Sequence, residues 1–150
     1  MKRRQPGQIV VLEDFDEDFE TVLEAARRSG LNNSIRRAST GGACMRLLQE
    51  MKQKTAALPA LLILDLNTPE EDGREALRYI KQHEDLRLVP LVILSSSANA
   101  ADLEMCYAHG ANAYHLKPLE YHAHLQTVQE IFEYWLGSVS LPEKENYRRL

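Results

Sequence analysis

The sequence has few of the residues that mark disulfide-rich, metal-binding or membrane proteins. Its two cysteines, Cys44 and Cys106, lie far apart and outside any CxxC or Cys/His pattern, so we expect both to be reduced packing residues. His122 and His124 are two residues apart and do not share a helix face, which argues against a metal pair. No apolar run approaches the roughly 18 residues of a membrane span, and no signal peptide is recognisable. We therefore expect a cytoplasmic protein that does not enter a membrane.

The sequence also lacks an excess of positive charge. Its formal net charge is −4, which argues against a nucleic-acid partner. The basic residues that do gather, which we interpret as a solvated face, are Arg27, Arg28, Arg36 and Arg37. No GxGxxG or Walker glycine loop occurs, so nucleotide binding has no support. No Gly-x-Ser-x-Gly pattern surrounds the three serines 95–97, so a hydrolase elbow is not indicated either.

The 150 residues alternate between short apolar runs and amphipathic stretches, and this length is typical of one domain. The pattern predicts strands over 8–13, 33–38, 60–65, 90–95 and 112–116, and helices over 16–29, 41–54, 73–83, 100–109 and 119–136. Three of the strands are almost continuously apolar, which indicates a parallel sheet buried on both faces. Five strand–helix units in succession predict a doubly wound α/β fold.

Polar side chains follow the apolar runs at the points where the strands end. Glu13 and Asp14 follow Ile9–Leu12, Asp65 follows Leu61–Leu64, and Ser95 and Lys117 end two later runs. Because functional groups of open α/β sheets gather at the carboxyl ends of strands, we expect these residues to converge. Three acids and one base suit a divalent metal and a phosphoryl group. The acidic run 13–20 could alternatively be only a solvated loop.

This ordered set resembles the receiver domains of two-component response regulators over roughly residues 8–136. The matching features begin with the acidic pair Glu13-Asp14 and with Asp65, which is followed by Asn67, by Pro69 and, eight positions after Asp65, by Gly73. The later features are Ser95, the pair Lys117-Pro118, and Tyr114, which lies three residues before the lysine. The resemblance implies a flavodoxin-like five-stranded sheet in the order 2-1-3-4-5. It leaves residues 1–7 as an N-terminal tail and 137–150 as a C-terminal extension.

The resemblance also implies roles for these residues. Asp65 would be the phosphoacceptor, with Mg²⁺ held by Asp14, Asp65 and the backbone carbonyl of Asn67, and by Glu13 directly or through water. Lys117 would pair with the phosphoryl group.

Four further residues have implied roles in switching or structure. Ser95 and Tyr114 would form the switch pair, because the hydroxyl moves to the phosphate and the aromatic ring turns inward. Pro69 and Gly73 would be structural, and Pro118 would follow a cis bond.

A narrower likeness connects the chain with small response regulators encoded with bacterial phytochromes. It implies a histidine kinase partner of phytochrome type and a homodimer through the fifth strand, the last helix and the C-terminal extension. The last helix carries a wide apolar stripe that we expect to face the core, namely Tyr121, Leu125, Val128, Phe132 and Trp135, widened by Ile131 and Tyr134. The dimer candidates are Phe132, Trp135 and Leu136. A helix fully covered by its own sheet explains the stripe equally well.

The leading hypothesis is a phosphorylated signalling switch that is not a conventional enzyme but catalyses its own phosphorylation and dephosphorylation. The first alternative is a pseudo-receiver, a binding module that keeps the fold without being phosphorylated. The second is an aspartate-nucleophile phosphohydrolase. That class of enzyme needs a second acid two residues after the nucleophile, where this chain has Asn67.

Overall fold

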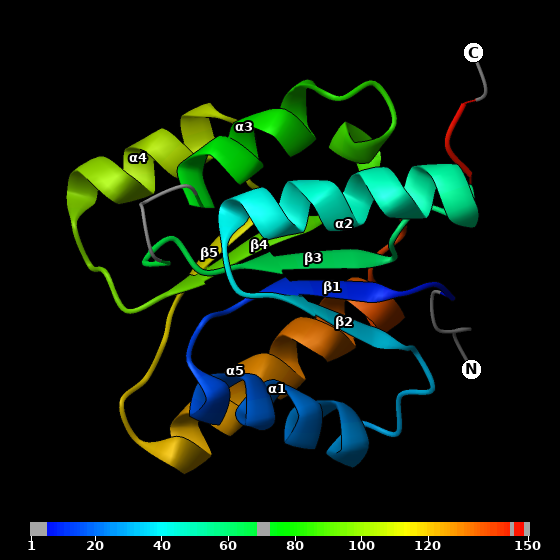
Figure 1. Cartoon of the computed structure of the whole chain (residues 1–150). Coiled ribbons are helices and arrows are strands. Elements are labelled where there is room, and N and C mark those ends of the chain that lie inside the picture. Colours follow the sequence, from blue (N-terminus) through cyan, green and yellow to red (C-terminus); the bar gives the residue numbers. More distant parts are fainter. Residues whose placement is uncertain (1–5, 69–72, 145, 149–150) are drawn as a thin grey trace.

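The computed structural model describes residues 6–68, 73–144 and 146–148, which form one parallel sheet between two layers of helices (Figure 1). The strands are β1 (Ile9–Leu12), β2 (Ile35–Ala38), β3 (Leu61–Leu64), β4 (Leu91–Ser95) and β5 (Ala113–Leu116). The α-helices are α1 (Asp16–Arg28), α2 (Gly41–Lys54), α3 (Gly73–Gln82), α4 (Ala100–Ala108) and α5 (Tyr121–Glu133). The strand order β2-β1-β3-β4-β5 confirms the predicted doubly wound fold.

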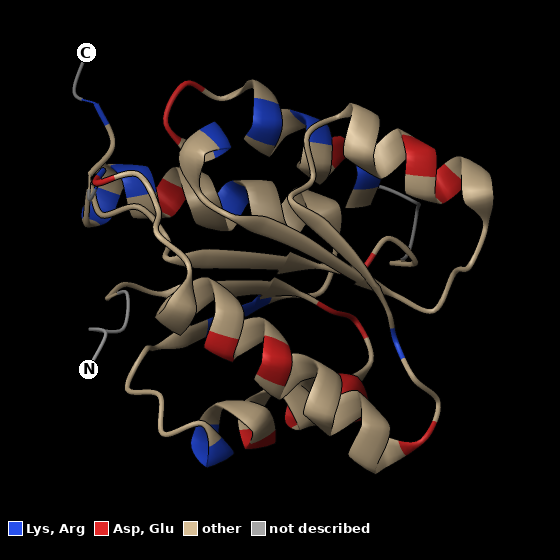
Figure 2. Cartoon of the chain, turned by 180° about the vertical axis from the view of Figure 1, so that it is seen from behind, with Lys and Arg blue, Asp and Glu red and all other residues tan. Residues whose placement is uncertain are grey.

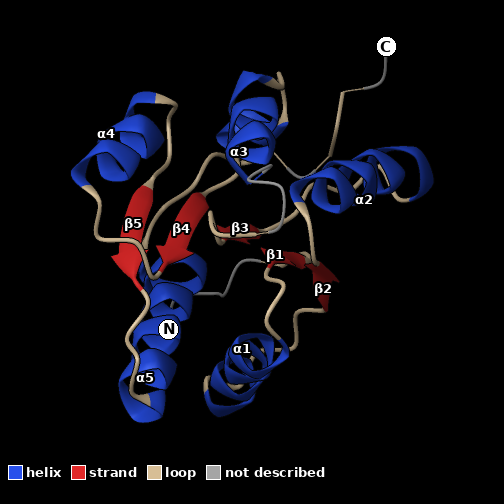
Figure 3. Ribbon diagram, turned by 60° about the vertical axis from the view of Figure 1, so that its left-hand side comes forward, coloured by secondary structure: helices blue, strands red, loops and turns tan. Residues whose placement is uncertain are grey.

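Helices cover both faces of the sheet, with α2, α3 and α4 on one side and α1 and α5 on the other (Figures 1 and 3). Alternate residues of one strand point into opposite layers. In β1, Val10 and Leu12 pack in the core beneath α2 and α3, whereas Ile9 and Val11 pack beneath α1 and α5. Burial on both faces explains why these strands read as unbroken apolar runs.

The predicted element bounds agree with the structure to within two residues, except at the end of the last helix. There the α-helix ends at Glu133 and continues as a π-helical turn, Tyr134–Ser138. A short 3-10 helix, Leu86–Leu88, was not predicted. Local chemistry accounts for several helix starts, since side-chain oxygens of Thr40, Asn99 and Glu120 accept backbone N–H groups in the first turns of α2, α4 and α5.

The strand register brings the ends of the central strands to one edge of the sheet. Leu12 of β1 lies opposite Leu64 of β3, so the residues that follow them, Glu13 and Asp65, leave the sheet together. Ser95 lies opposite Leu116, and its carbonyl accepts the backbone N–H of Lys117 at 2.8 Å. The fold therefore places the acids and the lysine at the same edge.

Two of the three expected dimer candidates lie in the chain's own core. Phe132 and Leu136 are each 1% exposed and pack beneath the sheet with α1, whereas Trp135 is half-buried. The explanation in which the sheet covers its own helix is therefore correct for these two side chains. Because α1 and α5 pack side by side, they leave no apolar side of Phe132 uncovered.

The apolar stripe is also narrower than predicted at both ends. Tyr121 is 46% exposed because the buried part of α5 begins only with His124 and Leu125. Tyr134 is 52% exposed, while its neighbour Ile131 is buried as expected. Tyr121 at the start of α5 and Tyr134 just after its end are therefore exposed aromatic side chains.

The last described residues of the C-terminal extension fold back onto α2. Asn146 forms an antiparallel bridge with Ala57, and the backbone N–H of Tyr147 donates to the carbonyl of Ala56 at 2.9 Å. The Tyr147 ring is buried, and its hydroxyl donates to the carbonyl of Leu48. The carboxylate of Asp85 is almost fully buried and is bound by the ammonium group of Lys144 and the backbone N–H of Arg148.

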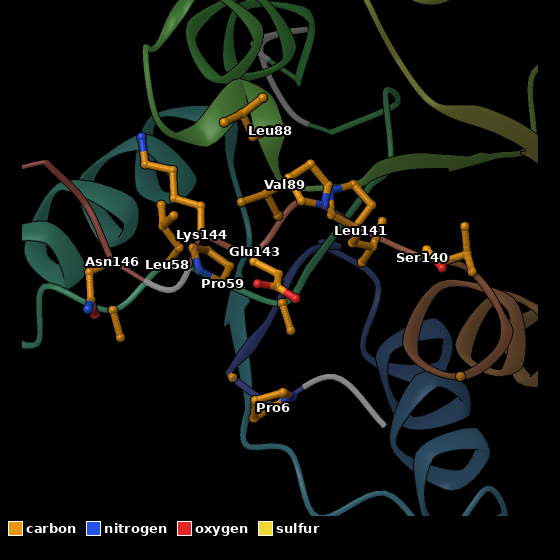
Figure 4. Close-up of a pocket in the computed structure, with 17 residues that line it drawn as sticks. Pro6, Leu58, Pro59, Leu88, Val89, Ser140, Leu141, Glu143, Lys144 and Asn146 are labelled. Carbon is orange, nitrogen blue, oxygen red and sulfur yellow. The ribbon is translucent and has the colours of Figure 1, made fainter. Parts of the chain in front are cut away.

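A hollow of about 930 Å³ lies beside this segment, at the amino ends of β1, β3 and β4. Figure 4 shows side chains from residues 58–59, 88–89, 140–144 and 146 around it. It contains none of the acidic residues at the opposite edge of the sheet. Among the described residues, we find no helix with the length and apolar character that crossing a bilayer would demand.

Replacing Tyr147 tests the stabilising role of the C-terminal segment. We expect Tyr147→Ala to lower the free energy of unfolding by about 3 kcal/mol, because it empties a buried aromatic site. Tyr147→Phe, which removes only the hydroxyl, should cost about 1 kcal/mol. Urea denaturation of both variants measures the difference, and an alanine variant as stable as the original chain would contradict the packing described above.

Candidate functional site

Three carboxylates meet at the carboxyl ends of β1 and β3. Glu13, Asp14 and Asp65 each offer an oxygen, and these oxygens all lie within 4.8 Å of one another. Figure 2 shows an acidic stretch leaving this end of the sheet and a basic stretch on the loop beside it. Glu13 and Asp65 are buried, whereas Asp14 is exposed. The predicted convergence of the acids is confirmed, and the alternative of a solvated loop does not apply to Glu13.

Lys117 is the cation of this site and forms ion pairs with three different acids. Its Nζ lies 2.7 Å from Glu13 Oε1, 2.8 Å from Asp18 Oδ2 and 3.0 Å from Asp65 Oδ2. The side chain is only 10% exposed. Burial lowers the pKa of Lys117, but hydrogen bonds to Asp18 and Glu13 and the charges of Glu13 and Asp65 outweigh it, so the pKa is raised. The ammonium group therefore stays charged and occupies all three of its donors.

Glu13 is the acid most affected by burial. Desolvation raises its pKa to about 7, even though the hydrogen bond and charge of Lys117 act in the opposite direction. The charge of Asp65 adds to the rise, and the backbone N–H of Phe15 donates to Glu13 Oε2 at 3.2 Å. Close to neutral pH, Glu13 thus exchanges a proton readily, and a bound cation would favour its ionised form.

Both carboxylate oxygens of Asp65 are hydrogen-bonded. Oδ2 faces Lys117, and Oδ1 accepts the backbone N–H of Asn67 at 3.0 Å. The side-chain nitrogen Nδ2 of Asn67 in turn donates to the hydroxyl groups of Ser95 and Ser96, at 3.2 and 3.3 Å. Ser95 is 0% exposed, so its hydroxyl lies beneath the surface on the Asp65 side of the β4–α4 loop.

Tyr114 is tied to the same loop. Its hydroxyl donates to the carbonyl of Ser97 at 2.8 Å, and the backbone N–H of Ser97 donates to Ser95 Oγ at 3.2 Å. Ser97 also donates its hydroxyl to Asp102, which Arg74 holds at 2.8 Å. The predicted switch pair is therefore connected through one residue, Ser97, although Ser95 and Tyr114 are not in hydrogen-bond contact with each other.

The remaining predicted residues have different outcomes. A Cβ on Gly73 would lie 2.9 Å from the carbonyl oxygen of Asp65, so only glycine allows this close approach of α3 to the site. Pro69 lies outside the described residues. The expected cis bond before Pro118 is wrong, because no cis peptide occurs among the described residues. The trans form is the intrinsically preferred one, and Lys117 reaches the acids from it.

No sequence pattern singled out Asp18, and His124 stood out only as one of an improbable pair of metal ligands. Asp18 lies in the first turn of α1 and binds Lys117, and the only signal for it was the acidic run that contains it. His124 is buried on α5 with Nδ1 3.9 Å from Asp18 Oδ1. Burial lowers the pKa of His124, and the charge of Asp18 only partly offsets this. A neutral imidazole, that of His124, therefore lies next to the Asp18–Lys117 ion pair.

The three clustered carboxylates fit a hard divalent cation. Mg²⁺ prefers oxygen ligands and usually takes one or two carboxylates together with water and phosphate oxygens. Asp14 is exposed and so leaves an approach from solvent to the buried oxygens of Glu13 and Asp65.

The fold and the site together define a receiver-type α/β module, in which a buried aspartate at the end of the third strand faces a lysine from the fifth. The chain belongs to the family described as the response regulator receiver domain, whose model matches residues 9–129. The family proteins act in two-component phosphorelay signalling, which confirms the functional class expected from the sequence.

Individual relatives are similar over nearly the whole chain. A probable methanogenesis regulatory protein of Methanothrix harundinacea, FilR2, is 34% identical over 91% of this chain and 88% of its own length. The response regulator Rcp1 of Synechocystis sp. is 35% identical over 91% of this chain and 94% of Rcp1.

Solved structures agree with this similarity. The crystal structure of the Mn²⁺-bound form of Rcp1 has a TM-score of 0.83, covering 91% of this chain and 99% of that one at 35% identity. The phosphorylated cyanobacterial phytochrome response regulator RcpA has a TM-score of 0.85, covering 93% and 100% at 32% identity.

The raised pKa of Glu13 predicts a specific pH dependence of stability. A carboxyl whose pKa is higher in the folded than in the unfolded chain stabilises the fold most below pH 4.5, and this contribution is lost as the pH rises through about 7. In metal-free buffer, the stability of the original chain relative to Glu13→Gln should therefore fall by roughly 2–3 kcal/mol between pH 4.5 and 8. Urea denaturation across this range measures it.

The control for this experiment is Glu20→Gln, which alters an exposed acid of α1. It should leave the pH profile of stability unchanged. Parallel profiles for the original chain and Glu13→Gln would show that burial does not raise the pKa of Glu13.

Proposed function

We propose that the chain is a single-domain phosphorylation switch that accepts a phosphoryl group on Asp65 from a phosphohistidine of a histidine kinase. The observation that supports this best is the buried Asp65 carboxylate, held by Lys117 beside two further acids. In the transfer, a carboxylate oxygen of Asp65 forms a bond to phosphorus as the phosphorus–nitrogen bond to the kinase imidazole breaks. The product is an acyl phosphate.

We further propose Mg²⁺ as the resident cation, held by Asp14, Asp65 and the backbone carbonyl of Asn67. Glu13 would bind it directly or through water. The cation would neutralise the repulsion between the incoming phosphoryl oxygens and the carboxylates. Asp14 and Asp65 lie in the acidic cluster that could hold it, and the likeness to a Mn²⁺-bound relative is in keeping with this.

Lys117 and Ser95 would receive the transferred phosphoryl oxygens. Lys117 already carries a charge at Asp65 Oδ2, and it can exchange one carboxylate partner for a phosphoryl oxygen without moving its backbone. Since catalysis of phosphoryl transfer is mostly positioning and charge stabilisation, these residues would promote both phosphorylation and hydrolysis at Asp65.

The switch would then spread from Ser95 to Tyr114. If the Ser95 hydroxyl turns to a phosphoryl oxygen, it leaves the backbone N–H of Ser97, whose carbonyl holds the Tyr114 hydroxyl. Movement of this loop would free Tyr114 to turn inward, and the surface formed by α4, β5 and α5 would change. Output would then pass to a protein that reads this surface.

The partners we propose are a histidine kinase, of phytochrome type, and a second copy of the chain. The phytochrome link is carried over from RcpA, a phytochrome response regulator, and from a response regulator in red light signalling of R. palustris that is 28% identical with a TM-score of 0.79. The homodimer would use β5, α5 and the start of the C-terminal extension. Exposed apolar side chains along that face are Leu116, Tyr121 and Tyr134, with Trp135 half-buried beside them.

Intact-mass spectrometry after incubation with acetyl phosphate tests the phosphoacceptor. We expect a gain of one phosphoryl group that requires Mg²⁺ and is lost in Asp65→Asn, because the amide is not a nucleophile at this site. Glu20→Gln, which changes an exposed acid of α1 outside the site, is the control and should still be labelled.

The outcome also separates the three functional classes. Stable labelling fits a switch, rapid turnover without accumulation fits a phosphohydrolase, and an unlabelled protein in all conditions fits a pseudo-receiver. Labelling that persists in Asp65→Asn would move the acceptor to another residue.

Sedimentation of a charged variant tests the proposed dimer. Tyr134→Glu places a charge among the exposed apolar side chains of the proposed interface and should shift the protein from dimer to monomer. Gln49→Glu adds the same charge at an exposed position of α2, which covers the opposite face of the sheet (Figure 1), and should leave the dimer intact. Retention of the dimer in Tyr134→Glu would place the interface elsewhere.

A further inference from the structure

Two adjacent arginines on β2, Arg36 and Arg37, have opposite surroundings. The sequence placed both on a solvated face, and Arg36 is indeed exposed. Arg37 instead turns toward the β1–α1 turn, and its side chain is only 25% exposed. The pairing of Val11 with Arg37 places this guanidinium directly beside the end of β1.

The guanidinium of Arg37 makes three contacts that span the β1–α1 turn. Its Nε donates to the backbone carbonyl of Glu13 at 2.9 Å, and its NH1 lies 2.8 Å from Asp16 Oδ1. Its central carbon lies 4.8 Å from the centroid of the Phe19 ring. Glu13 and Asp16 bracket Asp14, so one side chain holds both ends of the segment that carries the acidic pair.

The helix that follows this turn lacks a side-chain cap at its N-terminus. The N-cap residue of α1 is Phe15, and no side-chain hydrogen bond caps the helix, in contrast to α2, α4 and α5. Other contacts that restrain the turn are the hydrogen bond from the Glu13 backbone N–H to the carbonyl of Ala38, the hydrogen bond from the Phe15 backbone N–H to Glu13 Oε2, and the ion pairs of Lys117 with Glu13 and Asp18. Arg37 has only donors and so does not cap the N–H groups of α1, but it ties the Glu13 carbonyl to the Asp16 carboxylate across the turn.

We propose that Arg37 is a positioning residue that fixes the β1–α1 turn so that Glu13 and Asp14 face Asp65. Insofar as it concerns a cation, this inference rests on the proposed function. The fork of the guanidinium matters here, because Arg37 binds the carbonyl and the carboxylate through two different nitrogens at a fixed spacing, whereas lysine would keep the positive charge on a single nitrogen.

Charge and geometry predict opposite effects on cation binding. If only its positive charge mattered, Arg37 would repel a cation, so Arg37→Gln would bind it more tightly and Arg37→Lys would bind it unchanged. If Arg37 positions the acids, both variants bind more weakly. The matched controls are Arg36→Gln and Arg36→Lys, which alter the neighbouring arginine on the same strand.

The experiment uses Mn²⁺ as the probe and measures its affinity for the full chain by electron paramagnetic resonance. We expect Arg37→Lys and Arg37→Gln to weaken binding about tenfold, as for other groups that orient metal ligands. The Arg36 variants should stay within about twofold, since in the described part of the chain Arg36 is exposed and forms no hydrogen bond or ion pair with the turn. Unfolding free energies of all four variants show that the proteins compared are folded.

Hydrogen exchange of the metal-free protein gives a second measurement that does not depend on a cation. Amides of residues 13–18 should exchange faster in Arg37→Lys than in the original chain or in Arg36→Lys. The proposal would be overturned if Arg37→Lys changed neither the exchange rates nor the Mn²⁺ affinity. It would also be overturned if Arg37→Gln bound Mn²⁺ more tightly while Arg37→Lys bound it unchanged. A chain that binds no Mn²⁺ would overturn the metal site of the proposed function, and exchange alone would then decide whether Arg37 holds the turn.

Discussion

The ammonium group of Lys117, buried among three carboxylates, is the interaction on which the site depends. It joins side chains from β1, α1 and β3 to the loop after β5, so one cation connects four elements. Without it, Glu13 and Asp65 would be like charges in a low-dielectric setting, and removing one partner of such a buried pair typically costs about 3–5 kcal/mol. The carboxylates outnumber this one ammonium group, and the excess of negative charge favours a divalent cation. Burial is the main cause of the raised pKa of Glu13, and the charge of Asp65 adds to it.

The two edges of the sheet are held in different ways. At the carboxyl edge, polar groups meet through exchangeable contacts, and Ser97 links the buried Ser95 to Tyr114. At the amino edge, the C-terminal segment is fixed by a buried ring and by ion pairs to a buried carboxylate, that of Asp85. Buried packing at the amino ends of the strands, together with polar contacts that can exchange at their carboxyl ends, suits a protein in which a local change of charge must alter a surface without unfolding the core.

Much of the fold could be predicted because it rests on local patterns. Unbroken apolar runs identified β1, β3 and β4, and the strand ends pointed to Asp65 and Lys117. What the sequence could not supply are contacts between distant residues of unremarkable type. In the sequence, nothing distinguishes Arg37 from its exposed neighbour Arg36. The extent of the buried face of α5 depends on how closely α1 packs against it, and hydrophobic periodicity does not reveal this. The expected cis bond before Pro118 came from the family likeness alone and is wrong.

Chemical location of the acyl phosphate is the most direct test of Asp65 as the phosphoacceptor. Borohydride reduces an aspartyl phosphate to homoserine, and peptide mass spectrometry of the phosphorylated, reduced protein then reports the modified position. We expect homoserine at position 65 alone, formed only when a divalent cation is present during phosphorylation. Homoserine at position 14, or at any other acid of the cluster, would contradict the assignment of Asp65 as the residue that Lys117 and the neighbouring acids serve.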